Sequence, residues 1–228
     1  LRFLERYSVS SVPRMIVESR EANIAAMSWM DGESVNAPDE KDVDSILRLV
    51  AELRALSMAE GADHMANASA AVFSAAAAVR QVEERLLRLK QVTTGHPDLE
   101  KFLSQELRPV ADRVTDWVKA AYDEAGIGFD TELVAGQRVL SPSDFGFHNA
   151  RRRPDGRLGF VDFEYFGWDD PVRLLSDFLL HPGMGLTEEQ RHHFFTRALS
   201  LFSDPPSGNG DFPLRFDLLY PLVGLRWC

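Results

Sequence analysis

Apolar side chains recur every three or four residues along much of the chain, and this spacing puts them on one face of an α-helix. The clearest example is the stretch 62–90, where Val72, Val79, Val82 and Leu86 follow this spacing. We therefore predict one long scaffold helix there and assign it no chemistry. The pattern predicts further helices over 1–7, from within 33–44 to about 57, and over 98–126, 171–179, 187–202 and 216–227.

Residues with known preferences for helix ends mark several of these boundaries. Asp170 followed by Pro171 predicts an N-cap with proline at the first helical position. Thr187 with Gln190 predicts a capping box. Pro109 lacks the backbone N–H that a helix interior needs, so we expect it to kink or split its helix.

Shorter stretches predict strands between and before the helices. Residues 14–18 and 23–29 should form a small hairpin around a turn, and residues 137–140 a further short strand. The Pro-, Gly- and Ser-rich stretch 203–213 predicts a loop. More helices than strands are expected, and the strands are short, so the fold class is α+β.

Asp155-Gly156 is a strong turn signal between two extended segments, because both residue types tolerate positive φ. If these two residues form the turn, Pro154 pairs with Arg157, and the register further along places Asn149 opposite Asp162. An amide oxygen and a carboxylate would then lie side by side at the open end of this hairpin.

Asp144 precedes Asn149 by five residues, in a segment that Pro142 and Gly146 mark as loop. Carboxylate and amide oxygens are the ligands that Mg²⁺ prefers in proteins. Together with Asp162, these residues predict a magnesium site. A loop aspartate that caps a turn, next to an ordinary surface hairpin, would give the same spacing, and the residues alone leave both interpretations open.

Composition and charge narrow the class of protein. Of the 228 residues 45% are hydrophobic, which is enough to form a sizeable core, and the net charge of −10 argues against a nucleic-acid partner. The single cysteine, Cys228, allows no disulfide within the chain and favours a reducing compartment. No apolar run suits a membrane span and no signal peptide is visible, so we predict a cytoplasmic protein without a membrane partner.

Two local charge clusters have competing interpretations. The arginines at 151–153 suit a solvated hairpin better than a phosphate site. The acidic run at 33–44 suits the start of a helix, where carboxylates interact favourably with the macrodipole, better than a site for a cationic substrate.

Several motifs occur in an order that resembles a known family. The segments are Ser143–Asn149 with Asp144 and Asn149, Val161–Glu164, Gly167–Pro171, and Met27–Gly32 upstream. They are similar to the catalytic segment, the Asp-Phe-Glu motif, the Gly-x-Gly-Asp-Pro motif and the hinge of the aminoglycoside phosphotransferase and choline kinase-like family. The resemblance implies a protein-kinase-like fold, mainly its helical C-terminal lobe.

The resemblance also implies roles for individual residues. Asp144 would orient the hydroxyl of a small-molecule substrate and accept its proton, and the bound cofactors would be ATP and Mg²⁺. Asn149 and Asp162 would hold Mg²⁺, and Glu164 would serve a second metal ion.

The upstream motif implies a nucleotide-binding segment. Residues 1–32 would form a remnant of the nucleotide lobe with its hinge, and residues 33–228 the helical lobe with the catalytic loop and the metal-binding hairpin. Ser28, Trp29 and Met30 would bind the cofactor, with backbone groups of the first and third contacting adenine.

The chain departs from the family pattern at three places. Pro142 stands where a histidine is usual, and either Leu174 or Asp177 matches a structural aspartate. The phosphate-covering loop and its lysine should lie before residue 1, so we expect the chain to be a fragment of a longer protein.

The resemblance implies an ATP-dependent phosphotransferase that acts on a hydroxyl of an antibiotic, a sugar or an amino alcohol. A non-catalytic kinase-like binding protein is the main alternative. A metal-dependent hydrolase, in which His148 joins Asp144, Asp162 and Glu164, is another. The sequence does not determine the oligomeric state.

Overall fold

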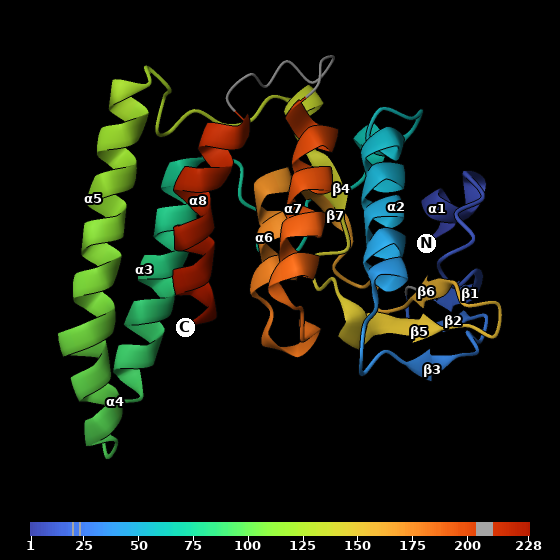
Figure 1. The fold of residues 1–228 in the computed structure, drawn as a ribbon, viewed down its shortest axis with the longest axis horizontal. Helices are drawn as coiled ribbons and strands as arrows, with labels where there is room; N and C mark the ends of the chain where they lie inside the picture. Colours follow the sequence, from blue (N-terminus) through green and yellow to red (C-terminus); the bar gives the residue numbers. More distant parts are fainter. Residues whose placement is uncertain (20, 23, 204–211) are drawn as a thin grey trace.

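The computed structural model describes residues 1–19, 21, 22, 24–203 and 212–228. Most of the loop predicted at 203–213 therefore lies outside the described residues. The short strands β1, β2, β3, β5 and β6 gather at one end of the molecule with helix α1, while α3, α4 and α5 form the other end (Figure 1). Helices α6, α7 and α8 lie between them. Within the described residues, no helix is both long and apolar enough to cross a membrane.

Eight α-helices and several short helical turns are present in the described part of the chain. The α-helices are α1 (Arg2–Arg6), α2 (Glu40–Leu56), α3 (Ala75–Gln91), α4 (Pro97–Phe102), α5 (Arg108–Glu124), α6 (Pro171–Leu180), α7 (Glu188–Ser203) and α8 (Phe212–Trp227). The short turns are η1 (Ala62–His64), η2 (Leu103–Leu107), η3 (Ala135–Gln137), η4 (Phe147–Asn149) and η5 (Pro182–Met184).

The strands form three small antiparallel sheets. They are β1 (Met15–Ser19), β2 (Ile24–Met27), β3 (Glu33–Ser34), β4 (Val139–Ser141), β5 (Ala150–Arg152), β6 (Leu158–Phe160) and β7 (Gly167–Asp169). The pairings are β1 with β2, β3 with β5 and β5 with β6, and β4 with β7. The predicted first hairpin is confirmed, and so is the α+β class with its excess of helix.

The predicted helix over 62–90 is wrong in its first half. Only η1 is helical before Ser74, whose side chain caps α3 by accepting the N–H of Ala77 at 3.1 Å. The segment between them pairs instead with β7: Ala68 donates its N–H to Trp168 O, and Trp168 donates to Ala66 O, both at 2.9 Å. These long-range backbone bonds replace the helical ones, which a local periodicity cannot reveal.

The predicted register of the second hairpin is wrong by one residue. Ala150 pairs with Phe160 and Arg152 with Leu158, so the loop has three residues rather than two. The Gly156 N–H donates to Arg153 O at 2.9 Å and Gly156 has a φ of +78°, which is the common three-residue turn that ends in a left-handed glycine. The backbone of Asn149 consequently faces Val161 and not Asp162.

The predicted helix ends are confirmed. Asp170 accepts the N–H of Val172 at 2.8 Å, and Thr187 and Gln190 form the reciprocal capping box. Pro109 lies in the first turn of α5, directly after the π-helical turn η2. The chain thus accommodates the missing N–H by widening the preceding turn instead of breaking the helix.

The two charge clusters have structural roles. Arg152 pairs with Asp42 of α2, whose carboxylate is 3% exposed, and Arg153 donates to Ser10 O at 2.7 Å. Asp42 also completes a capping box with Asp39 at the start of α2, so the acidic run contains a helix start as predicted. The arginines keep partial contact with solvent, and Arg152 and Arg153 also fasten the hairpin to α2 and to the N-terminal segment.

A substitution at Gly167 tests the contact between β7 and the segment before α3. A Cβ there would lie 2.6 Å from Ala68 N and from Asn67 C, which are backbone atoms with little freedom to move. We expect Gly167→Ala to lower the free energy of unfolding by about 2 to 3 kcal/mol through overpacking. Urea denaturation measures this.

The matched control is Gly136→Ala, because a Cβ at Gly136 meets nothing within 4 Å. The free energy of unfolding of this variant should stay within about 0.5 kcal/mol of the wild-type value. Equal stability of the two variants would contradict the close contact at β7.

Candidate active site

The loop that carries Asp144 is fixed by aromatic side chains on either side of Gly146. Phe145 and Phe147 are 4% and 1% exposed, and both rings contact Phe178 of α6, with centroids 5.9 and 5.5 Å apart. A side chain at Gly146 would overlap the thioether of Met184 in η5. The buried segment Phe145–Phe147 anchors the part-exposed Asp144 at the surface of the core, which suits a residue that must keep its place.

The turn before Asp144 is unusual. Ser143 has a φ of +70°, a conformation that non-glycine residues adopt only when their surroundings hold them there. Its N–H donates to Ser141 Oγ at 3.0 Å, and its hydroxyl donates to Ser69 O at 3.2 Å. The carbonyl of Pro142 accepts the Asp144 N–H at 3.0 Å, so proline at this position is compatible with a well-defined loop.

Asn149 lies at the end of η4, immediately before β5. Its side-chain N–H₂ donates to the backbone carbonyl of Asp144 at 3.1 Å, which leaves the amide oxygen available to a ligand. Its backbone carbonyl accepts the N–H of Val161 at 2.9 Å. Asn149 therefore connects the catalytic loop to the second strand of the hairpin.

Asp162 follows the hairpin with a φ of +65°, which turns the chain out of strand geometry. Partial burial raises the pKa of its carboxyl group, and the neighbouring carboxylates of Glu164 and Asp144 raise it further, while His148 lowers it. Glu164 and Asp144 thus lie near enough to Asp162 to influence its charge, although the register that suggested Asn149 opposite Asp162 was wrong.

These oxygen atoms fit a divalent cation. Asn149 offers an amide oxygen that its own hydrogen bond orients, and Asp162 and Glu164 offer carboxylates that repel each other in the metal-free protein. Hard oxygen ligands of this kind suit Mg²⁺, and a cation would remove the repulsion.

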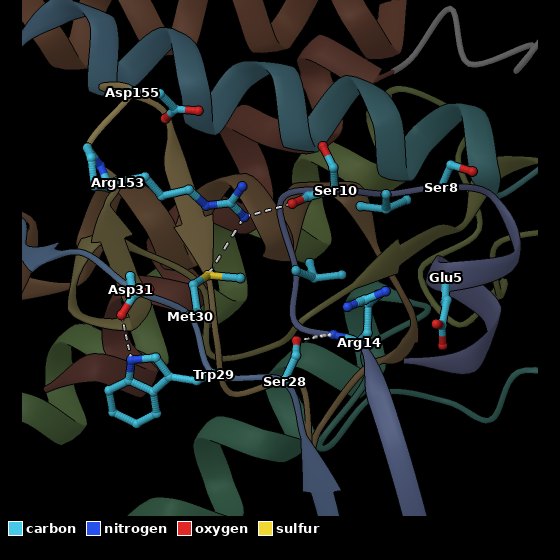
Figure 2. Close-up of a pocket in the computed structure, with 13 residues that line it drawn as sticks. Glu5, Ser8, Ser10, Arg14, Ser28, Trp29, Met30, Asp31, Arg153 and Asp155 are labelled. Carbon is cyan, nitrogen blue, oxygen red and sulfur yellow. Dashed lines mark hydrogen bonds between the residues drawn. The ribbon is translucent and has the colours of Figure 1, made fainter.

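The predicted hinge residues follow β2. Ser28 donates its N–H to Arg14 O at 2.9 Å. Its hydroxyl accepts the Arg14 N–H, also at 2.9 Å (Figure 2). Within the described residues, neither the carbonyl of Ser28 nor the N–H of Met30 has a hydrogen-bond partner. Trp29 is 88% exposed, and its indole N–H donates to Asp31 at 2.8 Å.

A cavity of about 650 Å³ borders this hinge segment, and Figure 2 shows Arg14 and Arg153 beside it. Arg153 reaches across to Ser10 O and to the sulfur of Met30. The hinge residues Ser28, Trp29 and Met30 line the cavity, whereas the carboxylate cluster does not. The two groups of predicted site residues therefore do not share this cavity.

A buried ionic network lies behind the catalytic loop. Arg173 is 3% exposed and contacts Asp169 at 2.8 Å, Asp177 at 3.2 Å and the hydroxyl of Ser143 at 3.3 Å. Burial raises the pKa of Asp169 to about 7, against the opposing effect of Arg173. Of the two candidates for the structural aspartate, Leu174 packs in the core and Asp177 carries the ion pairs.

Two residues next to the loop, Arg173 and His181, have no role in the sequence-based prediction. An arginine and an aspartate four positions apart inside the apolar α6 would have indicated the Arg173–Asp177 pair. His181 has no comparable signal, because only the fold brings it to the catalytic loop, where its ring stacks on that of His148 with centroids 4.2 Å apart. The adjacent His192 and His193 form no pair of ligands, since His193 bonds Asp44 at 2.8 Å.

A sequence profile of the phosphotransferase enzyme family matches residues 1–208. No curated protein matches the chain. Among solved structures, choline kinase LicA from Streptococcus pneumoniae is 13% identical with a TM-score of 0.58, and the match covers 100% of this chain and 67% of that one. An ethanolamine kinase from Plasmodium vivax is 14% identical with a TM-score of 0.56, over 99% of this chain and 62% of that one.

A spectinomycin phosphotransferase in complex with ADP and spectinomycin is 11% identical with a TM-score of 0.58, and the match covers 100% of this chain and 80% of that one. At such low identity these likenesses show the fold alone. The predicted protein-kinase-like fold is confirmed. The chain spans about two thirds of the length of the choline and ethanolamine kinases that it matches.

Because other carboxylates lie near Asp162, we expect this residue to lower the free energy of unfolding of the metal-free protein. Because its pKa is raised above 3.8 in the folded state, the cost is present at neutral pH and disappears as the pH falls through the raised pKa. We expect Asp162→Asn to raise the free energy of unfolding by roughly a few tenths of a kcal/mol at pH 7 in EDTA, because solvent screens charges at this exposed position and asparagine also tolerates positive φ.

Urea denaturation checks this, with Asp116→Asn on the exposed surface of α5 as the control that should change nothing. The increase in the free energy of unfolding caused by Asp162→Asn should become smaller in acidic buffer. MgCl₂ should stabilise the wild type more than the Asp162 variant. A less stable variant in EDTA at neutral pH would argue against charge crowding at this site.

Proposed function

The chain belongs to the phosphotransferase enzyme family, and we propose that it transfers the γ-phosphoryl group of ATP to a hydroxyl group of a small molecule. The observation that carries the proposal is that the carboxylates of Glu164 and Asp144 lie near enough to Asp162 to raise its pKa, while Asn149 hydrogen-bonds the backbone of Asp144. Phosphoryl transfer depends mainly on positioning and charge neutralisation, and these residues supply both.

Asp144 would contact the acceptor hydroxyl. A carboxylate can accept the hydroxyl proton in this reaction, because the transition state is loose and the proton leaves late. The rigid aromatic anchor of the loop would hold this carboxylate in line with the transferred phosphoryl group. Correct placement of this kind contributes several kcal/mol to catalysis.

Asn149 and Asp162 would hold Mg²⁺, and Glu164 would serve a second ion. When bound, the metal neutralises charge on the ATP phosphates. The amide of Asn149 is oriented for this role by its bond to the Asp144 carbonyl, so the same residue ties the metal site to the acceptor site.

The hinge segment would bind adenine. The carbonyl of Ser28 and the N–H of Met30 are an acceptor and a donor two residues apart, which matches the amino group and ring nitrogen at one edge of adenine. Trp29 lies between them. In this proposal residues 1–32 would form the nucleotide-binding part, and residues 33–228 the catalytic and acceptor-binding part.

The acceptor belongs to the class of small hydroxyl compounds that includes amino alcohols, sugars and antibiotics. The similar structures are a choline kinase, an ethanolamine kinase and a spectinomycin phosphotransferase. Choline, ethanolamine and spectinomycin are therefore the first acceptors to test. A net charge of −10 is compatible with these compounds, which all carry positive charge.

Removal of the carboxylate at Asp144 or Asp162 should abolish turnover. We expect Asp144→Ala and Asp162→Ala in the full-length protein to lower kcat for ATP-dependent phosphorylation by about 10³-fold or more, because each removes a group that acts in the transition state. The measurement is ADP release in a coupled assay with each acceptor in turn.

Asp116→Asn on α5 serves as the control, and circular dichroism checks that each variant is folded. Near-normal turnover in either alanine variant would refute the assignment. ATP binding by the wild type without any ADP release would instead favour the non-catalytic kinase-like protein.

A further inference from the structure

Two histidines adjoin Asp144 and take no part in the function proposed above. His148 Nε2 lies 2.9 Å from Asp144 Oδ1. The ring of His181 stacks on the ring of His148, with an interplanar angle of 8°. The first histidine comes from η4 and the second from the end of α6, so the contact joins two segments that are distant in the sequence.

The position of His148 follows from the packing of its own loop. Phe147 is buried, and its N–H points at the sulfur of Met184 at 3.3 Å. The 3₁₀ turn η4 then directs the next side chain back over Asp144, four residues earlier. In the described part of the chain, His148 is the one side chain that hydrogen-bonds the Asp144 carboxylate.

The hydrogen bonds determine which nitrogen of each ring carries a proton. An ionised carboxylate only accepts hydrogen bonds, so His148 must donate from Nε2. His181 Nδ1 accepts the N–H of Gly183 at 3.0 Å, so a neutral His181 carries its proton on Nε2. Both rings are therefore expected in the same tautomer.

Asp144, His148 and His181 are also close enough to be considered as metal ligands. A metal ion lies in the plane of an imidazole that binds it through the lone pair on nitrogen. The two ring planes are parallel and stacked, so one ion cannot lie in both planes. His181 Nδ1 already accepts a hydrogen bond, and the remaining lone pair of His148 is on Nδ1, which faces Gly146. The geometry suits a support of Asp144 better than a metal site.

We propose that His148 is a positioning residue, whose Nε2–H holds the Asp144 carboxylate in the orientation that meets the acceptor hydroxyl, and that His181 fixes the His148 ring by stacking. This inference rests on the proposed function of Asp144. A half-exposed aspartate without such a bond would rotate among several rotamers, and only one of these would direct an oxygen at the acceptor. The ring of Trp227 packs edge-on against the ring of His181, with centroids 4.9 Å apart.

The kinetic test uses ATP with water as the acceptor, so that it does not depend on the natural substrate. His148→Leu should lower kcat for ADP release by about 10- to 100-fold, because a small misplacement of a reacting group has an effect of this size. The KM for ATP should stay within about twofold, since His148 does not contact the nucleotide in this proposal.

His148→Gln is the rescue variant, because its amide N–H₂ can replace the Nε2–H donor. It should recover kcat to within about threefold of the wild type. His192→Leu, an exposed histidine on α7, is the matched control and should change nothing. Equal losses in the leucine and glutamine variants, or a rise in KM without a fall in kcat, would refute a positioning role.

Nuclear magnetic resonance tests the geometry without any turnover. In protein labelled with ¹⁵N at histidine, both rings should show the Nε2–H tautomer, and the Nε2–H proton of His148 should be protected from exchange. Asp144→Ala should remove this protection and leave the tautomer of His181 unchanged. An unprotonated Nε2 on His148, or protection that survives Asp144→Ala, would overturn the inference.

The two tests separate the possible failures. If the wild type releases no more ADP than Asp144→Ala, the proposed function fails, and the resonance of His148 alone decides whether the histidine holds the carboxylate. If turnover is normal and the protected proton is absent, the positioning role fails and the proposed function stands.

Discussion

A buried guanidinium group determines how the segments around the catalytic loop fit together. Arg173 contacts Asp169, Asp177, the Ser69 carbonyl and the Ser143 hydroxyl, which belong to β7, α6, the segment before α3 and the catalytic loop. Leaving a buried charge without partners costs several kcal/mol, so all four segments must be in place at once. We infer that the network specifies one arrangement of these segments more than it adds stability.

The catalytic loop rests on this arrangement from one side and on an aromatic core from the other. Phe178 contacts the rings of Phe145 and Phe147, and it also contacts Phe194 of α7, with centroids 4.3 Å apart. A packed interior permits little movement, so the backbone that carries Asp144 and Asn149 is held closely. Hydrogen bonds then orient the exposed ends of both side chains. His148 bonds the Asp144 carboxylate, and the Asp144 carbonyl accepts the side-chain N–H of Asn149.

The exit of the hairpin combines features that are unfavourable in a metal-free protein. Asp162 has a positive φ, and its carboxylate is crowded by Glu164 and Asp144. Strained and repelling groups of this kind are typical of sites that a ligand completes. The hinge differs, because its unused hydrogen-bonding groups belong to the backbone, and Trp29 beside them is exposed to solvent. The proposed site therefore consists of a rigid part around Asp144 and Asn149 and an exposed part around Trp29.

The sequence by itself determined the class of fold and most helices with their caps, and it predicted Asp144, Asn149, Asp162 and Glu164 as site residues. It could do so because helix periodicity, capping chemistry and a short motif are local properties of the chain. The tertiary structure decided the rest. It reduced the predicted helix over 62–90 to α3 by pairing the preceding backbone with β7, and it shifted the hairpin by one residue through a three-residue turn. It also brought His181 to His148 and buried Arg173, because contacts between segments distant in the sequence depend on packing that no local pattern records.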